Sequence, residues 1–380
     1  MSRIAPIEEA LEAIAAGRMV ILVDDEDREN EGDLVVAADA VTAEHIAFMA
    51  REARGLICLT LTAERCADLH LEPMVDLNTA PLGTAFTRSI DHRHLGGLGA
   101  TARAATIRAA VDGSARAEDF VSPGHVFPLR ARPGGVLVRS GQTEGSVDLA
   151  RLAGRDPSGV ICEVMGADGT MMRLPKLLEF GERFDIPVAT VADLIRYRLH
   201  HERLVTCCSE ARLPTEFGEF TIRCYQDSVN GQVHVALVYG DPTASSPALV
   251  RVHRADTVAD VFGLDFLPSR SRLAWSLQHM AKEGAGVLVY LRPDGDDDPL
   301  DDRLQVYGAL ARGERPPGGS GMGFHDFGIG AQILRDLGLS EIRVITSSPR
   351  AFKGISGYGI TIVDWVPLGD APPAAEPAKP

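Results

Sequence analysis

An acidic segment near the amino terminus holds the residues whose types and spacing most clearly suggest chemistry. Residues 24–33 carry seven carboxylates and one arginine. Such crowding is repulsive unless a cation is bound, and clusters of oxygen ligands favour Mg²⁺ or Mn²⁺ over zinc. A charge run can also be a solvated surface loop. The segment therefore predicts a divalent-cation site, with a solvated loop as the competing interpretation.

The elements around this segment favour a ligand site. The continuous apolar run at residues 19–23 predicts a buried strand that leads directly into the acidic residues, and loops at strand ends often hold ligands. Further strands are predicted at residues 55–61, 135–138 and 159–164. Because predicted helices lie between these strands, the pattern indicates a mixed fold of helices and strands.

Length and composition limit the organisation of the chain. Its 380 residues suggest two or three domains, and the polar stretch at residues 200–212 marks a break. The net charge of −15 argues against a nucleic-acid partner. The sequence has no apolar run of membrane-spanning length, and its six cysteines are too few for a disulfide framework. These features predict a cytoplasmic protein without a membrane partner.

Four segments of the first half resemble one enzyme family. The string DDEDRENEGD at residues 24–33 is similar to the signature of 3,4-dihydroxy-2-butanone 4-phosphate synthase. The strings GLICL (55–59), PGHVFPLR (123–130) and GVICE (159–163) agree with the same family in the same order. The resemblance implies a lyase of riboflavin biosynthesis that converts D-ribulose 5-phosphate to L-3,4-dihydroxybutan-2-one 4-phosphate and formate. It also implies a homodimer and a phosphosugar as the small-molecule partner.

The resemblance assigns roles to a set of polar residues. We expect catalysis by His125, Glu163 and Glu31, with Asp24 in support, and Mg²⁺ or Mn²⁺ held by Glu29 and Gln142. The residues expected to bind substrate are Arg28, Glu29, Asp33, Arg139, Ser140, Gly141, Gln142, Thr143 and Glu163.

Two positions depart from the family pattern. Gln142 stands where the family has a histidine that binds the metal. A glutamine offers an oxygen to a hard cation but cannot act as a base. The segment at residues 96–103 keeps Arg103 but lacks the Thr, Ser and Asp of the family's substrate loop. These departures leave open a paralogue that acts on another phosphosugar, or a catalytically silent regulatory or scaffold protein.

The second half resembles GTP cyclohydrolase II over residues 209–367, but its functional positions differ. The three positions of the family's zinc-binding cysteines hold Asp256, Leu267 and Ser269. The phosphate-binding segment at residues 292–299 carries four aspartates and one arginine, and the catalytic Asp–Arg string is absent at 323–326. We therefore expect no zinc and no GTP hydrolysis.

The overall expectation is an α+β protein with two domains, each a mixed α/β sheet. A synthase-type domain at residues 1–203 precedes a cyclohydrolase II-like domain at 204–369, and an Ala/Pro-rich disordered tail follows at 370–380. We expect the second domain to stabilise or regulate the first.

Overall fold

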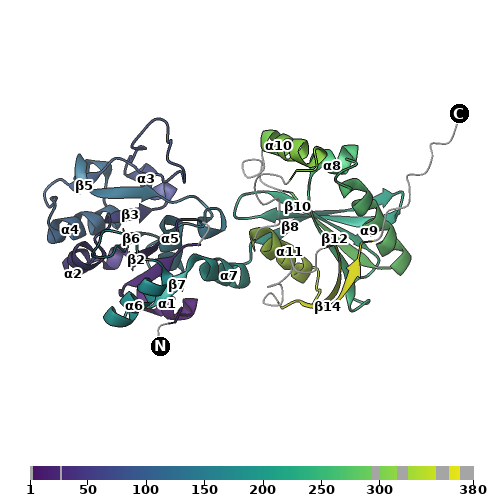
Figure 1. Ribbon diagram of the computed structural model, residues 1–380, viewed down its shortest axis with the longest axis horizontal. Helices are drawn as coiled ribbons and strands as arrows, with labels where there is room; N and C mark the ends of the chain where they lie inside the picture. Colours follow the sequence, from purple (N-terminus) through teal and green to yellow (C-terminus); the bar gives the residue numbers. More distant parts are fainter. Residues whose placement is uncertain (1–2, 26–27, 293–299, 315–323, 348–358, 369–380) are drawn as a thin grey trace. The chain divides into compact units, whose positions relative to one another are not determined.

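The computed structural model describes residues 3–25, 28–292, 300–314, 324–347 and 359–368. The chain divides into two compact units, Met1–Arg198 and Leu199–Pro380. Each unit is built on a seven-stranded sheet with helices packed against it (Figure 1). The predicted α+β fold with two mixed sheets is confirmed. In the described part of the chain, no helix is long and apolar enough to cross a membrane. The expected tail at 370–380 lies outside the described residues.

The sheet of the first unit has the strand order β4-β5-β3-β6-β2-β1-β7. Its strands are β1 (Val20–Val23), β2 (Gly32–Ala37), β3 (Cys58–Leu61), β4 (Ile90–His92), β5 (Phe120–Arg130), β6 (Gly159–Glu163) and β7 (Val188–Thr190). Its helices are α1 (Ile7–Ala15), α2 (Ala43–Phe48), α3 (Ala63–Asp68), α4 (Ala100–Val111), α5 (Gln142–Leu152), α6 (Leu174–Phe184) and α7 (Val191–His201), of which α7 extends past the boundary between the units. Strand β1 pairs with β2 in antiparallel and with β7 in parallel orientation, so the sheet is mixed.

Two apolar cores lie on opposite faces of this sheet because side chains alternate along each strand. Residues of α2, α4 and α6 pack with Leu34, Leu59 and Val160 in one core. Residues of α1, α5 and α7 pack with the neighbouring positions Val35 and Ile161 in the other. Both faces of the sheet are therefore covered, and polar side chains can reach solvent mainly at the ends of strands.

One predicted strand of the first unit is wrong. Residues 135–138 form a short 3-10 turn (Gly135–Leu137) instead of a strand. Gly134 and Gly135 have φ values of +91° and +64°, which an extended strand does not contain. Asp148 holds the turn by accepting a hydrogen bond of 2.8 Å from the backbone N–H of Val136. The buried Arg198 binds the Asp148 carboxylate at 2.8 Å and the carbonyl oxygen of Gly134 at 2.7 Å.

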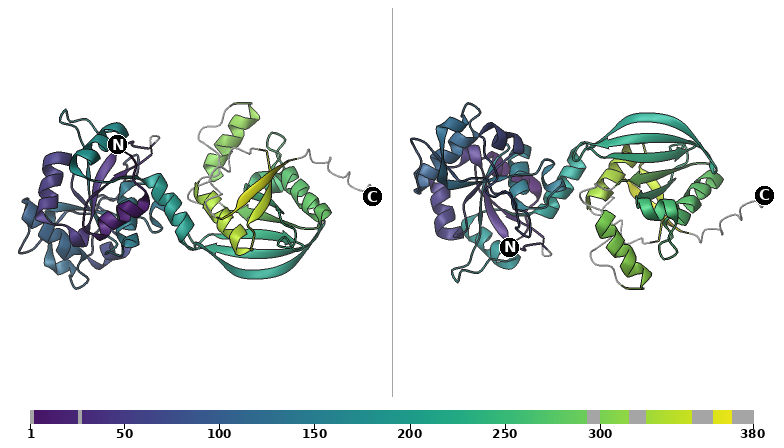
Figure 2. Two further views of the ribbon diagram at one scale, coloured as in Figure 1. Left: turned by 90° about the horizontal axis from the view of Figure 1, so that it is seen from below. Right: turned by 90° about the horizontal axis from the view of Figure 1, so that it is seen from above.

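The sheet of the second unit has the strand order β14-β13-β11-β12-β10-β9-β8. Its strands are β8 (Val205–Thr215), β9 (Gly218–Asp227), β10 (Val233–Tyr239), β11 (Ala248–Arg254), β12 (Gly286–Leu291), β13 (Glu341–Thr346) and β14 (Thr361–Pro367). Its helices are α8 (Thr257–Phe262), α9 (Ser269–Glu283), α10 (Leu300–Ala311) and α11 (Phe324–Asp336). Figure 2 shows the long strands β8 and β9, drawn in teal, curving along one edge of this sheet. Most of the stretch expected to be a break, residues 200–212, thus belongs to strand β8.

A candidate active site at the ends of β1, β2 and β6

The buried carboxylate of Asp24 organises the acidic loop that follows β1. It accepts hydrogen bonds from the backbone N–H groups of Glu29 and Glu31, at 3.2 and 2.8 Å. It also accepts one from Nη1 of Arg28 at 2.6 Å. The Asp24 side chain is fully buried, so the loop is folded around this carboxylate and does not extend freely into solvent. Glu26 and Asp27 lie outside the described residues.

Arg28 brings the two expected metal-binding residues together. Its Nη1 atom lies 2.6 Å from Oε2 of Glu29 and 2.9 Å from Oε1 of Gln142. Since both oxygens contact one nitrogen, they are at most 5.5 Å apart, the sum of the two distances. Glu29 belongs to the acidic loop and Gln142 begins α5, 113 residues later in the chain. The fold therefore assembles the oxygen pair that the sequence assigns to a cation.

Asp33 and Glu163 form a like-charged pair on neighbouring strands. The two residues lie directly opposite each other in the antiparallel pairing of β2 with β6. Two residues further along each strand, Val35 and Ile161 are also paired and belong to the core under α5, so Asp33 and Glu163 are on that face. Like charges in such a cross-strand pair destabilise the sheet. The pair is therefore expected to serve a ligand and not the fold.

The surroundings of Asp33 strengthen this conclusion. Asp33 is 3% exposed, and within the described parts of the chain its carboxylate receives no hydrogen bond. Burial, followed by the repulsion of Glu163 and Glu29, raises the pKa of Asp33 well above its ordinary value. Oε2 of Glu163 accepts a hydrogen bond of 2.8 Å from the backbone N–H of Leu56. Asp33 can thus hold a proton at a pH where a surface aspartate is ionised.

His125 lies in the same row of the sheet. On β5, Phe127 pairs with Cys58 of β3, and Cys58 pairs with Ile161 of β6. His125 and Glu163 are each two residues from these partners, so they flank Leu56 on one face, about 10 Å apart by two strand spacings. We conclude that the histidine and the Asp33–Glu163 pair face the same region.

Asp91 fixes the orientation of His125. Its Oδ2 atom lies 2.6 Å from Nδ1 of the imidazole, and its Oδ1 atom accepts the backbone N–H of His125 at 3.1 Å. Two glycines permit this approach: a Cβ on Gly96 would lie 2.4 Å from Cβ of Asp91, and one on Gly124 would overlap the backbone of Ile90. Because a carboxylate can only accept a hydrogen bond, Nδ1 of His125 carries the imidazole proton, and Nε2 remains available for proton transfer.

The amino end of α5 forms the anion-binding side of the site. Its N-cap, Gly141, supplies no side chain to bond the first N–H groups of the helix, which are therefore available to an anion. A Cβ on Gly141 would lie 2.5 Å from Nη1 of Arg139 and 3.1 Å from Nη2 of Arg28. Arg139 is anchored by Glu144 at 2.7 Å. Two guanidinium groups and a helix terminus thus converge on Gly141, between the exposed Ser140 and the buried Thr143.

The donor set fits a hard divalent cation. In the described residues, no three His, Cys, Asp or Glu side chains converge on one point. An ion would therefore bind Glu29 and the amide oxygen of Gln142, together with oxygens of substrate or water, as Mg²⁺ commonly does. The raised pKa of Glu31, caused by burial and then by Glu29, shows that negative charge around this pair is incompletely balanced. An added cation would relieve that repulsion.

The second unit has a buried hydrogen-bond network at the positions where the family that its sequence resembles binds zinc. Asp260 accepts hydrogen bonds from Ser269, from Tyr290 at 2.8 Å, and from the backbone N–H of Asp256 at 3.0 Å. Nε2 of His253 lies 3.1 Å from both of its oxygens. Burial opposes the ionisation of Asp260, but the hydrogen bonds from His253 and Ser269 outweigh it and lower its pKa to about 2.

This network does not fit a zinc ion. Arg303 and Tyr307 of α10 bind the Asp256 carboxylate, and Leu267 has no ligand atom. Of the cysteines in this unit, Cys224 on β9 is three strands from β11, about 14 Å by strand spacing. The aspartates are engaged by protein groups and thiolates are distant, so the donor set of a structural or catalytic zinc site is missing from the described residues.

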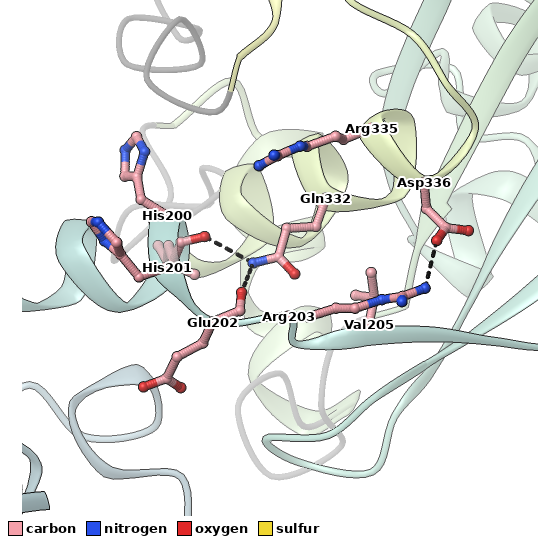
Figure 3. Close-up of a pocket in the computed structure, with 9 residues that line it drawn as sticks. His200, His201, Glu202, Arg203, Val205, Gln332, Arg335 and Asp336 are labelled. Atoms are coloured by element: carbon pink, nitrogen blue, oxygen red, sulfur yellow. Dashed lines mark hydrogen bonds and ion pairs between the residues drawn. The ribbon is translucent and has the colours of Figure 1, made fainter. Parts of the chain in front are cut away.

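A cavity of about 520 Å³ lies elsewhere in the second unit, between the end of α7 and α11. Figure 3 shows Gln332 pointing at the last turn of α7. Its amide donates to the carbonyl oxygens of Leu199 and Glu202 at 2.8 and 2.9 Å and accepts the N–H of Leu204 at 2.7 Å. Arg203 pairs with Asp336 at 2.8 Å across the same cavity. Gln332 thus serves as a cap for the helix end.

Comparison with known proteins agrees with these two units. The model of the 3,4-dihydroxy-2-butanone 4-phosphate synthase family matches residues 8–197. The chain belongs to this family. The GTP cyclohydrolase II model matches residues 206–367. The riboflavin biosynthesis protein RibBA of Aquifex aeolicus is 48% identical over 372 residues, 95% of this chain and 92% of that protein. The RibBA protein of Bacillus mycoides is 46% identical over 95% of this chain and 93% of its own length.

A solved structure matches across both units. It is RibBX of A. baumannii, described as a two-domain 3,4-dihydroxy-2-butanone 4-phosphate synthase. The TM-score is 0.78 at 40% sequence identity, and the match covers 96% of this chain and 100% of that one. The family and the α+β architecture are therefore established for both halves.

The synthase-like unit contains every residue that the sequence assigns to the site. Arg28, Glu29 and Gln142 are in direct contact, and Asp33 opposes Glu163. Two residues of the site, Asp91 and Arg173, are not predicted from the sequence; they bind residues 34 and 144 positions away. No local pattern marks either of them, because their partners are brought close only by the fold.

Proposed function

We propose that the first unit is a divalent-cation-dependent lyase that converts D-ribulose 5-phosphate to L-3,4-dihydroxybutan-2-one 4-phosphate and formate. The observation that carries this proposal is the pairing of the buried Asp33 with the half-buried Glu163, beside Arg28, Glu29 and Gln142. A polyhydroxylated substrate and a cation would satisfy a set of carboxylates that the protein itself leaves unbalanced.

The phosphate of the substrate is proposed to bind at the amino end of α5. Arg139 and Arg28 supply guanidinium groups on either side of Gly141, and the backbone from Ser140 to Thr143 supplies N–H donors. Such a clamp fixes one end of the sugar chain. The carbon atoms that react then lie toward Asp33 and Glu163.

Proton transfer is proposed for Glu163 and His125, with Glu31 in support. The reaction requires removal of a proton next to a carbonyl and its return at another carbon, which a carboxylate and an oriented imidazole can share. Burial and the charge of Glu163 raise the pKa of Asp33, and in its protonated form Asp33 can donate a hydrogen bond to a substrate oxygen. A divalent ion bound at Glu29 and Gln142 would supply Lewis-acid stabilisation of negative charge on neighbouring substrate oxygens.

The experiment is incubation of the protein with ribulose 5-phosphate and Mg²⁺, with formate release as the readout. Formate should appear with Mg²⁺ or Mn²⁺ and stop on chelation. The variant Glu163→Gln should lose activity, whereas Glu64→Gln, at an exposed position of α3, should retain it. A folded, metal-loaded sample that releases no formate would contradict the proposal.

The segment at residues 96–99 favours one alternative, a paralogue that acts on a different phosphosugar. It precedes α4, and its Gly99 caps the helix without a side chain. A substrate loop without polar side chains selects the hydroxyl pattern of a sugar weakly. Measuring activity with several pentose and pentulose phosphates distinguishes the two possibilities, since a paralogue would turn over another substrate faster than ribulose 5-phosphate.

The second unit is proposed to lack GTP cyclohydrolase II activity and to stabilise or regulate the first. Support comes from the Asp256–Asp260 network, whose oxygens are bound by protein groups. The protein should leave GTP unchanged in the presence of Zn²⁺. A chain that ends after His201 should differ from the full chain in stability, assembly or kinetics, and identical behaviour would defeat the proposed supporting role.

A further inference from the structure

Arg173, the N-cap of α6, binds the acidic loop through its guanidinium group. Its Nη1 atom donates to the carbonyl oxygen of Glu29 at 2.6 Å and also to that of Asn30. The same atom lies 3.9 Å from Oε1 of Glu31. The contacts span 142 to 144 positions of sequence, and neither the family resemblance nor the comparisons assign a role to this arginine.

The loop needs such an anchor because its backbone is bent. Asn30 has a φ of +55°, in the left-handed region that residues other than glycine rarely adopt. The bend is at Asn30, so Glu29 and Glu31 flank it directly in the chain. Asp24 binds the N–H groups of both glutamates, while Arg173 binds the carbonyl groups of Glu29 and Asn30. The N–H groups and the carbonyl groups of the bend are therefore held by two different charged side chains.

We propose that Arg173 is a positioning residue that holds the bent loop so that the Glu29 carboxylate stays beside the Gln142 amide. Arg173 touches the backbone of Glu29 and not its carboxylate, so it does not compete with a cation for the carboxylate oxygens, of which Oε2 is bound by Arg28. Its charge also lies beside a crowded set of carboxylates, which favours a closed loop over one splayed by repulsion. This inference rests on the proposed cation site.

A matched arginine in the same unit serves as the control. Arg155 donates from Nε and Nη2 to the carbonyl oxygen of Ala15, at 3.1 and 2.6 Å. It also lies 3.6 Å from Asp39. Arg155 therefore makes the same kinds of contact, backbone carbonyl plus nearby carboxylate, at the end of α1 and away from the acidic loop. Loss of either arginine should cost comparable stability.

The test measures Mn²⁺ binding to the full chain without substrate, by electron paramagnetic resonance, together with thermal unfolding and formate release. Arg173→Met should weaken Mn²⁺ binding by about tenfold, the effect of losing hydrogen bonds from a charged group. Arg173→Lys, which keeps the charge and a donor, should recover part of it. Arg155→Met should lower the unfolding temperature to a similar extent but bind Mn²⁺ like the parent protein.

The outcomes separate this inference from the proposed function. If the parent protein binds no Mn²⁺ and releases no formate, the proposed function itself fails. If the parent does both, but Arg173→Met binds Mn²⁺ within twofold of it, the positioning role is wrong. Equal weakening in Arg155→Met would likewise overturn it, because the effect would then reflect general loss of stability. If Arg173→Met does not fold, Arg173→Lys carries the comparison.

Discussion

Replacing Asp91 with asparagine would change the hydrogen-bond partner of His125 while keeping the shape of the side chain. The carboxylate of Asp91 lies 2.6 Å from Nδ1 of the imidazole and accepts the backbone N–H of His125 at 3.1 Å. An asparagine can still accept that N–H through its oxygen. Its amide nitrogen would then face Nδ1 and donate to it, which moves the imidazole proton to Nε2.

The size of the effect follows from this change of tautomer. A positioned general acid or base contributes about 10²- to 10⁴-fold to a rate, and an imidazole protonated on Nε2 cannot accept a proton there. We expect kcat to fall by at least about 100-fold, which corresponds to roughly 2.7 kcal/mol. KM should change by less than about threefold, because Asp91 contacts His125 and is not among the groups proposed to bind substrate.

Formate release at saturating Mg²⁺ measures both constants, and thermal unfolding checks that Asp91→Asn is folded. His125→Asn and the double variant complete a cycle. If the aspartate acts through the histidine, the double variant should be no slower than His125→Asn alone. A kcat within threefold of the parent for folded Asp91→Asn would refute the reasoning. So would full additivity of the two substitutions.

Three further predictions concern the charges of the two units. Because burial and Glu163 raise the native pKa of Asp33, the contribution of Asp33 to the stability of the metal-free protein is fully present below the unfolded pKa of 3.8 and is lost as the pH rises through the native pKa. Urea unfolding between pH 5 and 8 should show this loss of stability, and Asp33→Asn or added Mg²⁺ should make the loss smaller. A difference in stability between parent and variant that does not depend on pH would contradict this prediction. Gln142→His should bind Co²⁺ about tenfold more tightly than the parent by titration calorimetry. This affinity should decrease when the pH is lowered through about 6.5, because the imidazole is then protonated. An unchanged Co²⁺ affinity would mean that residue 142 does not contact the ion. Chelation of zinc should leave the unfolding of the second unit unchanged, and a chelator-sensitive transition would show that zinc is bound after all. Asp256→Ala removes a carboxylate that the partly buried Arg303 binds, and should lower the unfolding temperature by several degrees.

The sequence located the acidic site but not all of the elements that hold it. The buried strand at residues 19–23 was predicted because its apolar run is continuous, and β1 confirms it. Helix α5 was missed because its residues from Gln142 to Ala150 are all buried, including Glu144 and Asp148, so no polar face reveals its period. These buried carboxylates are paired with Arg139 and Arg198, which lie elsewhere in the sequence.

Strand β8 was missed for the opposite reason. Its residues from Thr206 to Arg212 are exposed, because β8 is an edge strand of its sheet. The alternation of apolar and polar residues that identifies a half-buried strand is therefore absent. The strand is defined by its pairing with β9, which a reading of local pattern does not contain.

Arg198 is the last residue of the first unit, yet its guanidinium group reaches back to the turn that precedes Arg139. A shortened chain that stopped one residue earlier would lose the guanidinium group that binds the enclosed Asp148 carboxylate at 2.8 Å, and would leave Asp148 to the more exposed Arg151 at 3.4 Å. The expected cost is about 3 kcal/mol, the lower end of the range for breaking a buried ion pair. The carboxyl-terminal limit of the first unit is therefore set by an ion pair and not by a gap in secondary structure. Any severing of the two halves should preserve this arginine, as termination after His201 does.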